Sequence, residues 1–513
     1  MFLGRRVLRS DYFYRFPWLL LMAALALSGL GVAGIYAATS GGEGDPFWST
    51  LAGKQVAWLG AAMLVFLAAL VPSYVRLAKY SYALYAAGLV SLVALAGMRY
   101  AGVRIPGFVY PINHAYSWIS IPGTSVKLQP SEIMKIAFIM SLAYYLRFRK
   151  NYRTFRGLLV PFVMALVPTA LILYQPDLGT AMLFLPVLFL MLFAAGARAK
   201  HLLAIIAMGL AMVPVFYSSM RGYQRMRIDS WLLNGCAERM HFALARPIAA
   251  NGAEPNDAGP EAADAPAVEK QTPDGRASAP VAAPLPRRAR LSDQEKADLV
   301  REVTGMWRFR LWRLATRVSW GTDKPEFVEA REALFGALDK GPGPKSFDAL
   351  RFFFGSLLDN YGHQLFQAKV AVGSGGLTGR GWLSGTQTRY GFLPEAHTDF
   401  LYPTLAEQFG FVGAAGVVVL YGLICLLGVD VSFSTTEPYG KLLVVGVVAL
   451  VAAQGFLNMA MSIGLMPITG IPLPLMSYGG SSLGSSFLAL GLLANVAVRR
   501  LYLIAPRPFE WRE

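Results

Sequence analysis

The sequence predicts an all-α polytopic membrane protein with about ten transmembrane helices. Of its 513 residues, 55% are hydrophobic and only 15% are charged, whereas soluble domains carry about 25% charged residues. The mean hydropathy is +0.44. The apolar residues gather in runs that approach the roughly 20 residues an α-helix needs to cross a bilayer. These three observations exclude a soluble globular protein.

Ten apolar runs are the expected spans. The first directly follows a basic N-terminal segment and is too long for the core of a signal peptide, so we expect it to be retained. Several of the others need polar flanking residues to reach full length. The ten runs are 17–38, 56–71, 80–98, 133–146, 158–174, 178–195, 202–217, 411–429, 442–463 and 481–498.

Basic residues in the short loops set the expected orientation. The formal net charge is +16, and the loops after the second, fourth, sixth and tenth runs hold Arg or Lys on the same side as the basic N-terminus. Because short cytoplasmic loops carry such an excess, both termini are expected in the cytoplasm, and no nucleic-acid partner is needed to explain the charge. Four segments then lie on the outer face: 99–129, 175–177, 218–400 and 464–480.

The chain divides into three expected parts, with a large extracytoplasmic loop between helices 7 and 8. Residues 1–234 hold helices 1–7, residues 235–358 are an insert, and residues 359–513 hold a polar loop and helices 8–10. Within the insert, residues 249–286 are rich in Ala, Pro, Gly and acidic residues and contain no aromatic residue. Such a composition buries too little surface to fold, which predicts a disordered linker.

Residues 292–358 are expected to form a small helical segment. Ser292 and Glu295 make a capping box before a helical pattern that carries several arginines and three tryptophans. A second helix is predicted over 325–338 and a third after Ser346. A solvated basic face accounts for this pattern; the alternatives are a dedicated binding module and a helix resting on anionic headgroups. The tryptophans are Trp307, Trp312 and Trp320.

The stretch 391–410 concentrates the unusual polar residues of the chain. It places Glu395, His397 and Asp399 within five residues and then runs through Pro403 into the eighth apolar run. Ionisable residues at the mouth of a membrane span are costly to hold there and by default mark function. Asp399 is therefore the candidate for the chemistry. The structural alternative is an N-cap of the following helix, which its distance from Pro403 only partly suits.

Four motifs match one known family in order along the chain. They are QPSEIMK at 129–135, QPDLGT at 175–180, GSGGLTGRGWLSGTQTRYGFLPEAHTDF at 373–400 and GLMPITGIPLPLMSYGGSS at 464–482. Together they resemble the SEDS family of cell-wall glycosyltransferases. The residues Gly385-Thr386-Gln387 and Ala406-Glu407 resemble its elongation branch, RodA, more than its division branch, FtsW. The departures from the family are Ser117-Trp118 in place of Arg-Trp, Gly362-His363-Gln364 in place of Gly-Tyr-Gln, and the insert.

The resemblance implies a ten-helix fold and an activity. The implied enzyme joins lipid II units into glycan strands on the outer face of the bacterial cytoplasmic membrane, releases undecaprenyl diphosphate, and serves cell elongation and shape. The implied partners are lipid II, a class B penicillin-binding protein that acts as transpeptidase, and the proteins of the elongation complex. No cofactor or metal ligand set is implied; a divalent cation, Mg²⁺ or Mn²⁺, at the diphosphate stays open.

Such a reaction can work with one carboxylate. Transfer from a polyprenyl diphosphate sugar needs a base to take the proton of the acceptor hydroxyl, while the diphosphate departs without a proton. A glycosidase commonly needs two carboxyl groups instead. With Asp399 as the base, opposite the leaving group, an α-linked donor gives a β-linked product with inversion.

A set of further polar residues is expected to line the substrate cavity. Glu132 and Lys135 could instead pair as structural glue inside the bundle. Asp177 could cap the next helix, and Glu407 could serve helix packing. His397 either orients the base or faces headgroups. The full set is Glu132, Lys135, Asp177, Lys369, Arg380, His397, Glu407, Ser477 and Tyr478.

Two loops rich in Gly complete the expected site. The glycines between 373 and 381 look like a phosphate loop, but neither a strand nor a helix start frames them, which favours a flexible loop near the site. Residues 464–480 hold too much Pro and Gly for a plain helix. They form either a re-entrant element over the site or a turn without substrate contact.

Two rival classes predict different features. A lipid II flippase or transporter would show paired halves with broken helices in corresponding positions, and no such repeat is visible in the sequence. A non-catalytic scaffold for a penicillin-binding protein would place no demand on Asp399.

Overall fold

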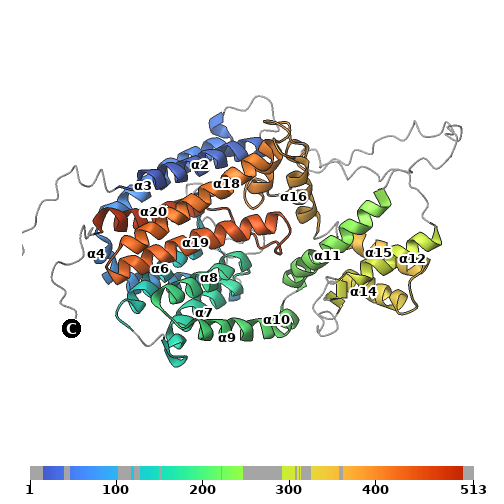
Figure 1. The fold of residues 1–513 in the computed structure, drawn as a ribbon, viewed down its shortest axis with the longest axis horizontal. Helices are drawn as coiled ribbons and strands as arrows, with labels where there is room; N and C mark the ends of the chain where they lie inside the picture. Colours follow the sequence, from blue (N-terminus) through green and yellow to red (C-terminus); the bar gives the residue numbers. More distant parts are fainter. Residues whose placement is uncertain are drawn as a thin grey trace, which may run out of the picture.

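The computed structural model describes most of the chain outside the expected linker (Figure 1). In this part α-helices dominate, and the sheet found there has two short strands, β1 (Ile119–Ser120) antiparallel to β2 (Lys127–Leu128). The predicted all-α fold class is confirmed. The described residues are 16–39, 47–101, 117–120, 127–149, 153–220, 222–245, 292–306, 309–310, 312–313, 325–357 and 362–500.

The helices fall into a membrane bundle and a group between its seventh and eighth expected spans. The bundle comprises α2 (Trp18–Thr39), α3 (Leu51–Leu70), α4 (Tyr74–Lys79), α5 (Ser81–Tyr100), α6 (Pro130–Leu146), α7 (Leu159–Tyr174), α8 (Leu178–Ala195), α9 (Ala199–Ala211), α10 (Val213–Ser219), α18 (Leu401–Ser434), α19 (Pro438–Ser462) and α20 (Gly480–Arg499). The second group comprises α11 (Gly222–Ala245), α12 (Asp293–Gly305), α14 (Pro325–Leu338), α15 (Pro344–Leu357), α16 (His363–Ser374) and α17 (Thr386–Arg389). Short 3₁₀ turns lie at η1 (Phe47–Ser49) and η3 (Arg156–Leu158).

Helices α19 and α20 form the centre of the bundle. In their membrane-length windows 61% and 78% of the residues are buried, against 28% for α3, α5 and α18, so the latter face outward. Helix α20 packs on α3, and α19 packs on α18, α8 and α6 (Figure 1). Small residues permit the close crossing of α20 and α3: a Cβ atom on Gly491 would lie 2.9 Å from the carbonyl oxygen of Phe66.

Eight of the described helices are long and apolar enough to cross a membrane. They are α2, α3, α5, α7 with its preceding turn, α8, α18, α19 and α20. The two other expected spans fall on α6, with 17 residues, and on α9, with 13 residues. Helix α6 begins at Pro130, before the apolar run, so it includes the charged residues of the QPSEIMK motif. The total of ten spans stays a prediction.

The four segments expected on one side of the membrane meet at one end of the bundle. The backbone N–H of Gln129 donates to Ser481 at 3.1 Å, and its side chain donates to Asp177 at 3.0 Å. The indole N–H of Trp231 donates to the Gly464 carbonyl at 3.0 Å. Segments far apart in the sequence are therefore joined at the end where α18 and α20 begin.

The insert has a hydrophobic core of its own. Helices α12, α14 and α15 pack with the middle of α11 around Trp312, which is 0% exposed. The capping box at Ser292 is present, and the helix predicted over 325–338 is confirmed as α14. Helix α12 ends earlier than its sequence pattern, at Gly305, and the third helix starts at Pro344, two residues before Ser346.

Two expectations about the insert need correction. Trp312 does not rest on headgroups or on a partner, because it fills the insert's own core, where its ring lies 5.2 Å from that of Phe353. The boundary expected between residues 234 and 235 falls inside α11, which runs unbroken from the bundle side into the insert. Trp307, Trp320 and the linker 249–286 lie outside the described residues.

Candidate functional site

Asp399 lies at the end of a tight turn directly before α18. Glu395 opens the turn with a φ of 53°. Its carbonyl accepts hydrogen bonds from the N–H groups of Thr398, Asp399 and Phe400 at 3.1, 3.1 and 3.3 Å. The N-cap position of α18 belongs to Phe400, and no side chain caps this end. Asp399 therefore does not serve as the helix cap that the sequence left as its structural alternative.

The loop between α19 and α20, residues 464–479, lies against this turn. The Ser477 hydroxyl donates to the carbonyl of Thr398, and the Tyr478 N–H donates to the carbonyl of His397 at 3.0 Å. Ser477 and Tyr478 thus reach the site through backbone contacts with the turn. The loop therefore lies over the turn, as the re-entrant element would, and its contact with substrate stays a prediction.

Two polar side chains of α19 hold the turn and the loop together. Asn458 is 0% exposed, and its side-chain amide donates to the carbonyls of Asp399 at 2.8 Å and Ile471 at 2.6 Å. One helical turn earlier, the Gln454 amide donates to the carbonyl of Pro472 at 2.9 Å. The backbone of Asp399 is therefore held by its own turn and by α19.

The surroundings of Asp399 favour its protonated form. Burial and the negative charges of Glu395 and Asp177 raise the pKa of the Asp399 carboxyl to about 6, while Arg227 acts in the opposite direction. The carboxyl points toward the loop, since a Cβ atom on Gly470 would lie 3.4 Å from its Oδ2. A carboxylate with a pKa this close to neutral is a suitable general base, because it is ionised at pH 7 and still accepts a proton readily.

His397 lies beside the site. Burial lowers the pKa of its ring. The ring lies 5.9 Å from that of Tyr478 in an edge-on arrangement. Among the described residues it makes no hydrogen bond to Asp399, so the orienting role of His397 stays a prediction.

Glu132 and Lys135 form an ion pair inside the bundle. Lys135 Nζ lies 2.8 Å from Glu132 Oε1, and both residues are almost fully buried. Ser485 donates to the other oxygen of Glu132 at 2.5 Å, and Lys135 also lies 3.4 Å from the amide oxygen of Gln454. The predicted pairing is confirmed. Because Gln454 also holds the loop over Asp399, the pair is connected to the site through α19.

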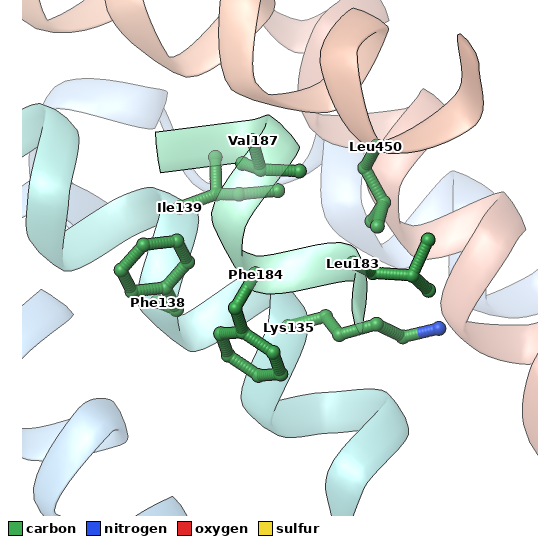
Figure 2. A pocket seen from close by; sticks show the side chains of 7 residues that line it. All are labelled: Lys135, Phe138, Ile139, Leu183, Phe184, Val187 and Leu450. Carbon is green, nitrogen blue, oxygen red and sulfur yellow. The ribbon is translucent and has the colours of Figure 1, made fainter. Parts of the chain in front are cut away.

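Lys135 also lines a narrow cavity between α6, α8 and α19, shown in Figure 2. Its empty space is about 160 Å³ but is too narrow to admit a water-sized molecule. Apart from Lys135 the lining is apolar. This cavity cannot hold a sugar, so it is a gap in the packing beneath the ion pair. Its lining residues are Lys135, Phe138, Ile139, Leu183, Phe184, Val187 and Leu450.

Asp177 caps α8 and also acts on the site. Its Oδ1 accepts from the Thr180 N–H at 3.0 Å, and its Oδ2 accepts from the Gln129 side chain at 3.0 Å. Burial raises the pKa of Asp177. The capping alternative is realised, and the charge of Asp177 still contributes to the raised pKa of Asp399.

Glu407 is committed to the loop that precedes Asp399. It is 0% exposed. Its Oε1 accepts from the N–H of Gln387 at 2.8 Å, and its Oε2 accepts from the N–H and hydroxyl of Thr388 at 3.1 and 2.6 Å. These bonds anchor α17 with both carboxylate oxygens. The Glu407 side chain thus positions the loop instead of serving helix packing, and its place at the substrate cavity stays a prediction.

The glycines between 373 and 381 serve close backbone contact. Helix α18 is kinked at Gly410, which has a φ of 66°, and the Gly-rich loop fills this kink. The Phe411 N–H donates to the Gly376 carbonyl at 2.8 Å. A Cβ atom on Gly379 would lie 2.1 Å from the carbonyl oxygen of Gln408. The expectation of a flexible loop is wrong, because backbone hydrogen bonds tie these glycines to α18.

Lys369 and Arg380 are engaged by neighbouring elements. Lys369 Nζ donates to Asn234 Oδ1 on α11 at 2.9 Å. Arg380 is exposed, and its Nε donates to the carbonyl of Ser374 at 2.8 Å. The structure gives neither side chain a contact with the Asp399 carboxyl.

Sequence reasoning missed three residues that lie at the site. Gln454 and Asn458 had a signal, because they are amide side chains four residues apart inside an apolar run, and polar residues inside a span usually face a functional interior. Arg227 had none, because it lies in a segment that carries several arginines. Arg227 comes close to Asp399 through the packing of α11 against the bundle, which the sequence does not predict.

Comparison with known proteins defines the family. The model of the cell cycle protein family that includes FtsW, RodA and SpoVE matches residues 17–238 and 351–502. The chain belongs to this family. The residues left unmatched in the middle, 239–350, fall within the insert, so the family's part of the chain is the bundle together with the loops around Asp399.

Members of the cell cycle protein family resemble the chain over nearly its whole length. Peptidoglycan glycosyltransferase RodA of Treponema pallidum is 30% identical over 496 residues, which cover 95% of this chain and 98% of that protein. Probable peptidoglycan glycosyltransferase FtsW of Geobacter metallireducens is 26% identical over 493 residues, 94% and 95% of the two chains. Both branches match, so the resemblance to RodA rather than FtsW stays a prediction.

A solved structure of this architecture supports the fold. It is described as "Structural coordination of polymerization and crosslinking by a peptidoglycan synthase complex". Its chain aligns with a TM-score of 0.57 at 21% identity, covering 94% of this chain and 97% of that one.

Proposed function

We propose that this protein is a peptidoglycan glycosyltransferase that polymerises lipid II into glycan strands at the outer face of the bacterial cytoplasmic membrane. Family membership and the names of its relatives support the reaction class. The observation that carries the proposal is Asp399, a carboxyl with a pKa of about 6 held between two loops at one end of a membrane bundle. The side of the membrane follows from the basic loops of the sequence.

In the proposed reaction Asp399 acts as the general base. The acceptor hydroxyl attacks the anomeric carbon of the donor while its proton moves to the Asp399 carboxylate. The bond from that carbon to the diphosphate oxygen breaks, and its electrons leave with undecaprenyl diphosphate. Because attack and departure occur on opposite faces of the sugar, an α-linked donor gives a β-linked strand.

Polymerisation of lipid II by the purified protein tests the proposal. Asp399→Asn should abolish polymer formation, because it keeps the shape of the side chain and removes the base. Asp430→Asn is the matched control, since Asp430 is an exposed residue near the far end of α18, and it should retain activity. Polymer made at the wild-type rate by Asp399→Asn would overturn the catalytic assignment and favour a scaffold. Movement of lipid II without polymer would favour a flippase.

The finer proposal is a role in cell elongation beside a class B penicillin-binding protein. The motif variants resemble RodA, and the solved structure of similar fold belongs to a peptidoglycan synthase complex. We expect the protein to co-purify with a single-span transpeptidase and with other elongation-complex proteins. Full activity in a preparation that contains no transpeptidase would contradict the partner part of the proposal.

A divalent cation at the diphosphate is a further part of the proposal. Among the described residues no three His, Cys, Asp or Glu side chains form a cluster that could hold a metal. Mg²⁺ on a diphosphate commonly needs only one or two protein carboxylates, because phosphate oxygens and waters complete its shell. Glu395 is exposed and lies one turn before Asp399, so it could hold Mg²⁺ or Mn²⁺ that arrives with the donor.

A further inference from the structure

One face of α11 reaches the elements around the catalytic turn. Arg227, Trp231 and Asn234 follow one another at spacings of four and three residues, so they share this face. The indole of Trp231 donates to the Gly464 carbonyl at 3.0 Å, and its ring packs on the hydrophobic cluster that contains Phe400. Asn234 accepts a hydrogen bond from α16. These contacts direct the face, with Arg227 one turn before Trp231, toward the turn before α18.

The guanidinium of Arg227 is uncommitted. Arg227 is partly buried, and within the described residues its side chain makes no hydrogen bond or ion pair. It is near enough to Asp399 for its charge to oppose the rise of the carboxyl's pKa. Arg225 differs, because it is fully buried, donates to the Tyr217 carbonyl at 3.3 Å and lies over the Tyr217 ring. Of these two arginines, Arg227 is the one available to a ligand.

The other expected cations of the site are engaged. Lys135 is paired inside the bundle, Lys369 is bonded to α11, and Arg380 is bonded to its own loop. Around Asp399 the charges of Glu395 and Asp177 are negative. An anionic substrate would be repelled from this environment unless a cation offsets the carboxylates.

We propose that Arg227 binds the diphosphate of the donor and stabilises the charge that develops on it as the bond to the sugar breaks. This inference rests on the proposed function. A guanidinium can donate two parallel hydrogen bonds to phosphate oxygens and keeps its charge at any physiological pH. Donors fixed where charge develops in the transition state stabilise it strongly.

The same contact links donor binding to the strength of the base. In the free protein the charge of Arg227 favours the ionised form of Asp399. Once a diphosphate neutralises that charge, the Asp399 carboxylate becomes the stronger proton acceptor. During transfer the proton moves to Asp399 and the bond electrons move to the diphosphate held by Arg227, so the two charges change at opposite sides of the reacting carbon.

Lipid binding to the full-length protein in nanodiscs tests the inference. The probes are undecaprenyl diphosphate and undecaprenyl monophosphate, each titrated against wild type, Arg227→Gln, Arg227→Lys and Arg239→Gln. Arg227→Gln should weaken binding of the diphosphate by about tenfold or more, with a smaller effect on the monophosphate. The affinity of Arg227→Lys for the diphosphate should lie between those of wild type and Arg227→Gln, because an ammonium keeps the positive charge but cannot donate two parallel hydrogen bonds. Arg239 is exposed on the same helix and pairs with Glu302 at 2.7 Å, so its variant should bind as wild type.

The outcomes separate this inference from the proposed function. If Arg227→Gln binds both lipids like Arg239→Gln, or loses both equally, the inference is overturned even when the wild type polymerises lipid II. If the wild type makes no polymer but binds diphosphate through Arg227, the proposed function fails and the diphosphate site stands. Should Arg227→Gln fail to fold, Arg227→Lys decides, since a diphosphate affinity equal to that of wild type would contradict bidentate binding.

Discussion

The side-chain amide of Asn458 donates to the backbone carbonyl of Asp399 at 2.8 Å and to that of Ile471 at 2.6 Å. One buried residue near the end of α19 thus ties the turn that holds Asp399 to the loop 464–479. The Gln454 amide one turn earlier, and the hydrogen bonds from Ser477 and Tyr478 to the turn, hold the same two segments together.

Asn458→Leu should lower both the rate of polymerisation and the stability of the protein. Leu keeps the volume but leaves two buried carbonyls without a donor, which costs about 1–3 kcal/mol each at most. We expect kcat to fall by about tenfold or more because Asp399 loses its backbone anchor, with little change in KM. Asn495→Leu is the matched control: its amide also donates to two carbonyls, those of Ala69 and Pro72. Equal losses of activity in both variants would refute a positioning role for Asn458.

Activity should titrate with the Asp399 carboxyl. Because burial raises its pKa to about 6, the base is ionised above this pH and protonated below it. The rate should therefore be constant from about pH 7 to 8 and fall about tenfold per unit below about pH 6. Rates of lipid II polymerisation across pH 5–8 measure this, and a midpoint near 4 would show that Asp399 is not held in the environment described.

Asp399→Asn should make the protein more stable at neutral pH. The carboxyl's pKa is raised on folding, so its ionised form opposes folding; this cost is absent below pH 3.8, grows between there and about 6, and is full above. The shift corresponds to at most about 3 kcal/mol, and to less because Asp399 is partly exposed. In detergent, the melting temperature of Asp399→Asn should exceed that of wild type at pH 8 and nearly equal it near pH 4. The melting temperature of Asp430→Asn should match that of wild type at both pH values.

Much of the fold and of the polar site was visible in the sequence. The apolar runs predict the membrane helices because a bilayer demands about 20 apolar residues per span, and the pairing of Glu132 with Lys135 followed from their spacing on one helix. Asp399 stood out because ionisable residues are rare beside a span.

The contacts between distant segments were not predictable. Glu407 is two turns beyond Asp399 along the chain, yet it anchors α17 through hydrogen bonds from Gln387 and Thr388. Arg227 is brought to Asp399 by the packing of Trp231, across more than 150 residues that include the insert. The periodicity of the sequence predicts which residues lie on the same face of a helix. It does not predict which other element packs against that face.

Glu407→Gln should detach the loop that precedes Asp399. The amide of Gln would present a donor to the N–H and hydroxyl of Thr388, so at least one buried hydrogen-bonding group loses its partner, at a cost of about 1–3 kcal/mol. We expect a lower melting temperature, faster proteolysis within residues 377–390 and reduced polymerisation. Glu437→Gln is the control, because Glu437 caps α19 at Gly440 with a 2.6 Å bond at the other end of the bundle. It should lose stability without exposing the loop.

Removing the linker of the insert should change little. Residues 249–286 close a long loop, and the closure cost changes by only about 0.6 kcal/mol for each doubling of loop length. Deletion of these residues should leave the melting temperature and the polymerisation rate near wild-type values. A marked loss of either would show that the linker makes contacts that its composition does not predict.

The helical part of the insert should behave as a small folded unit that is insensitive to lipid charge. Trp312 fills its core, and two of its surface arginines are paired, Arg313 with Asp339 at 2.9 Å and Arg239 with Glu302 at 2.7 Å. Trp312→Ala should unfold this unit, since loss of a buried Trp costs about 3–5 kcal/mol. It should also lower activity, because Trp231 of α11 packs on the insert core and also bonds to the loop 464–479.

Vesicle composition separates this interpretation from headgroup docking. In reconstituted vesicles the wild type should polymerise lipid II equally well with and without anionic lipid, and added salt should have little effect, because Trp312, one of the three tryptophans expected at the headgroups, lies inside the insert. Activity that rises with anionic lipid and falls with salt would restore the docking interpretation. Co-purification with the transpeptidase tests whether the insert binds the partner instead. If Trp312→Ala keeps a folded bundle and its polymerase activity but no longer co-purifies with the transpeptidase, the insert forms part of the partner interface. The proposed coupling between the insert and the site through α11 is then wrong.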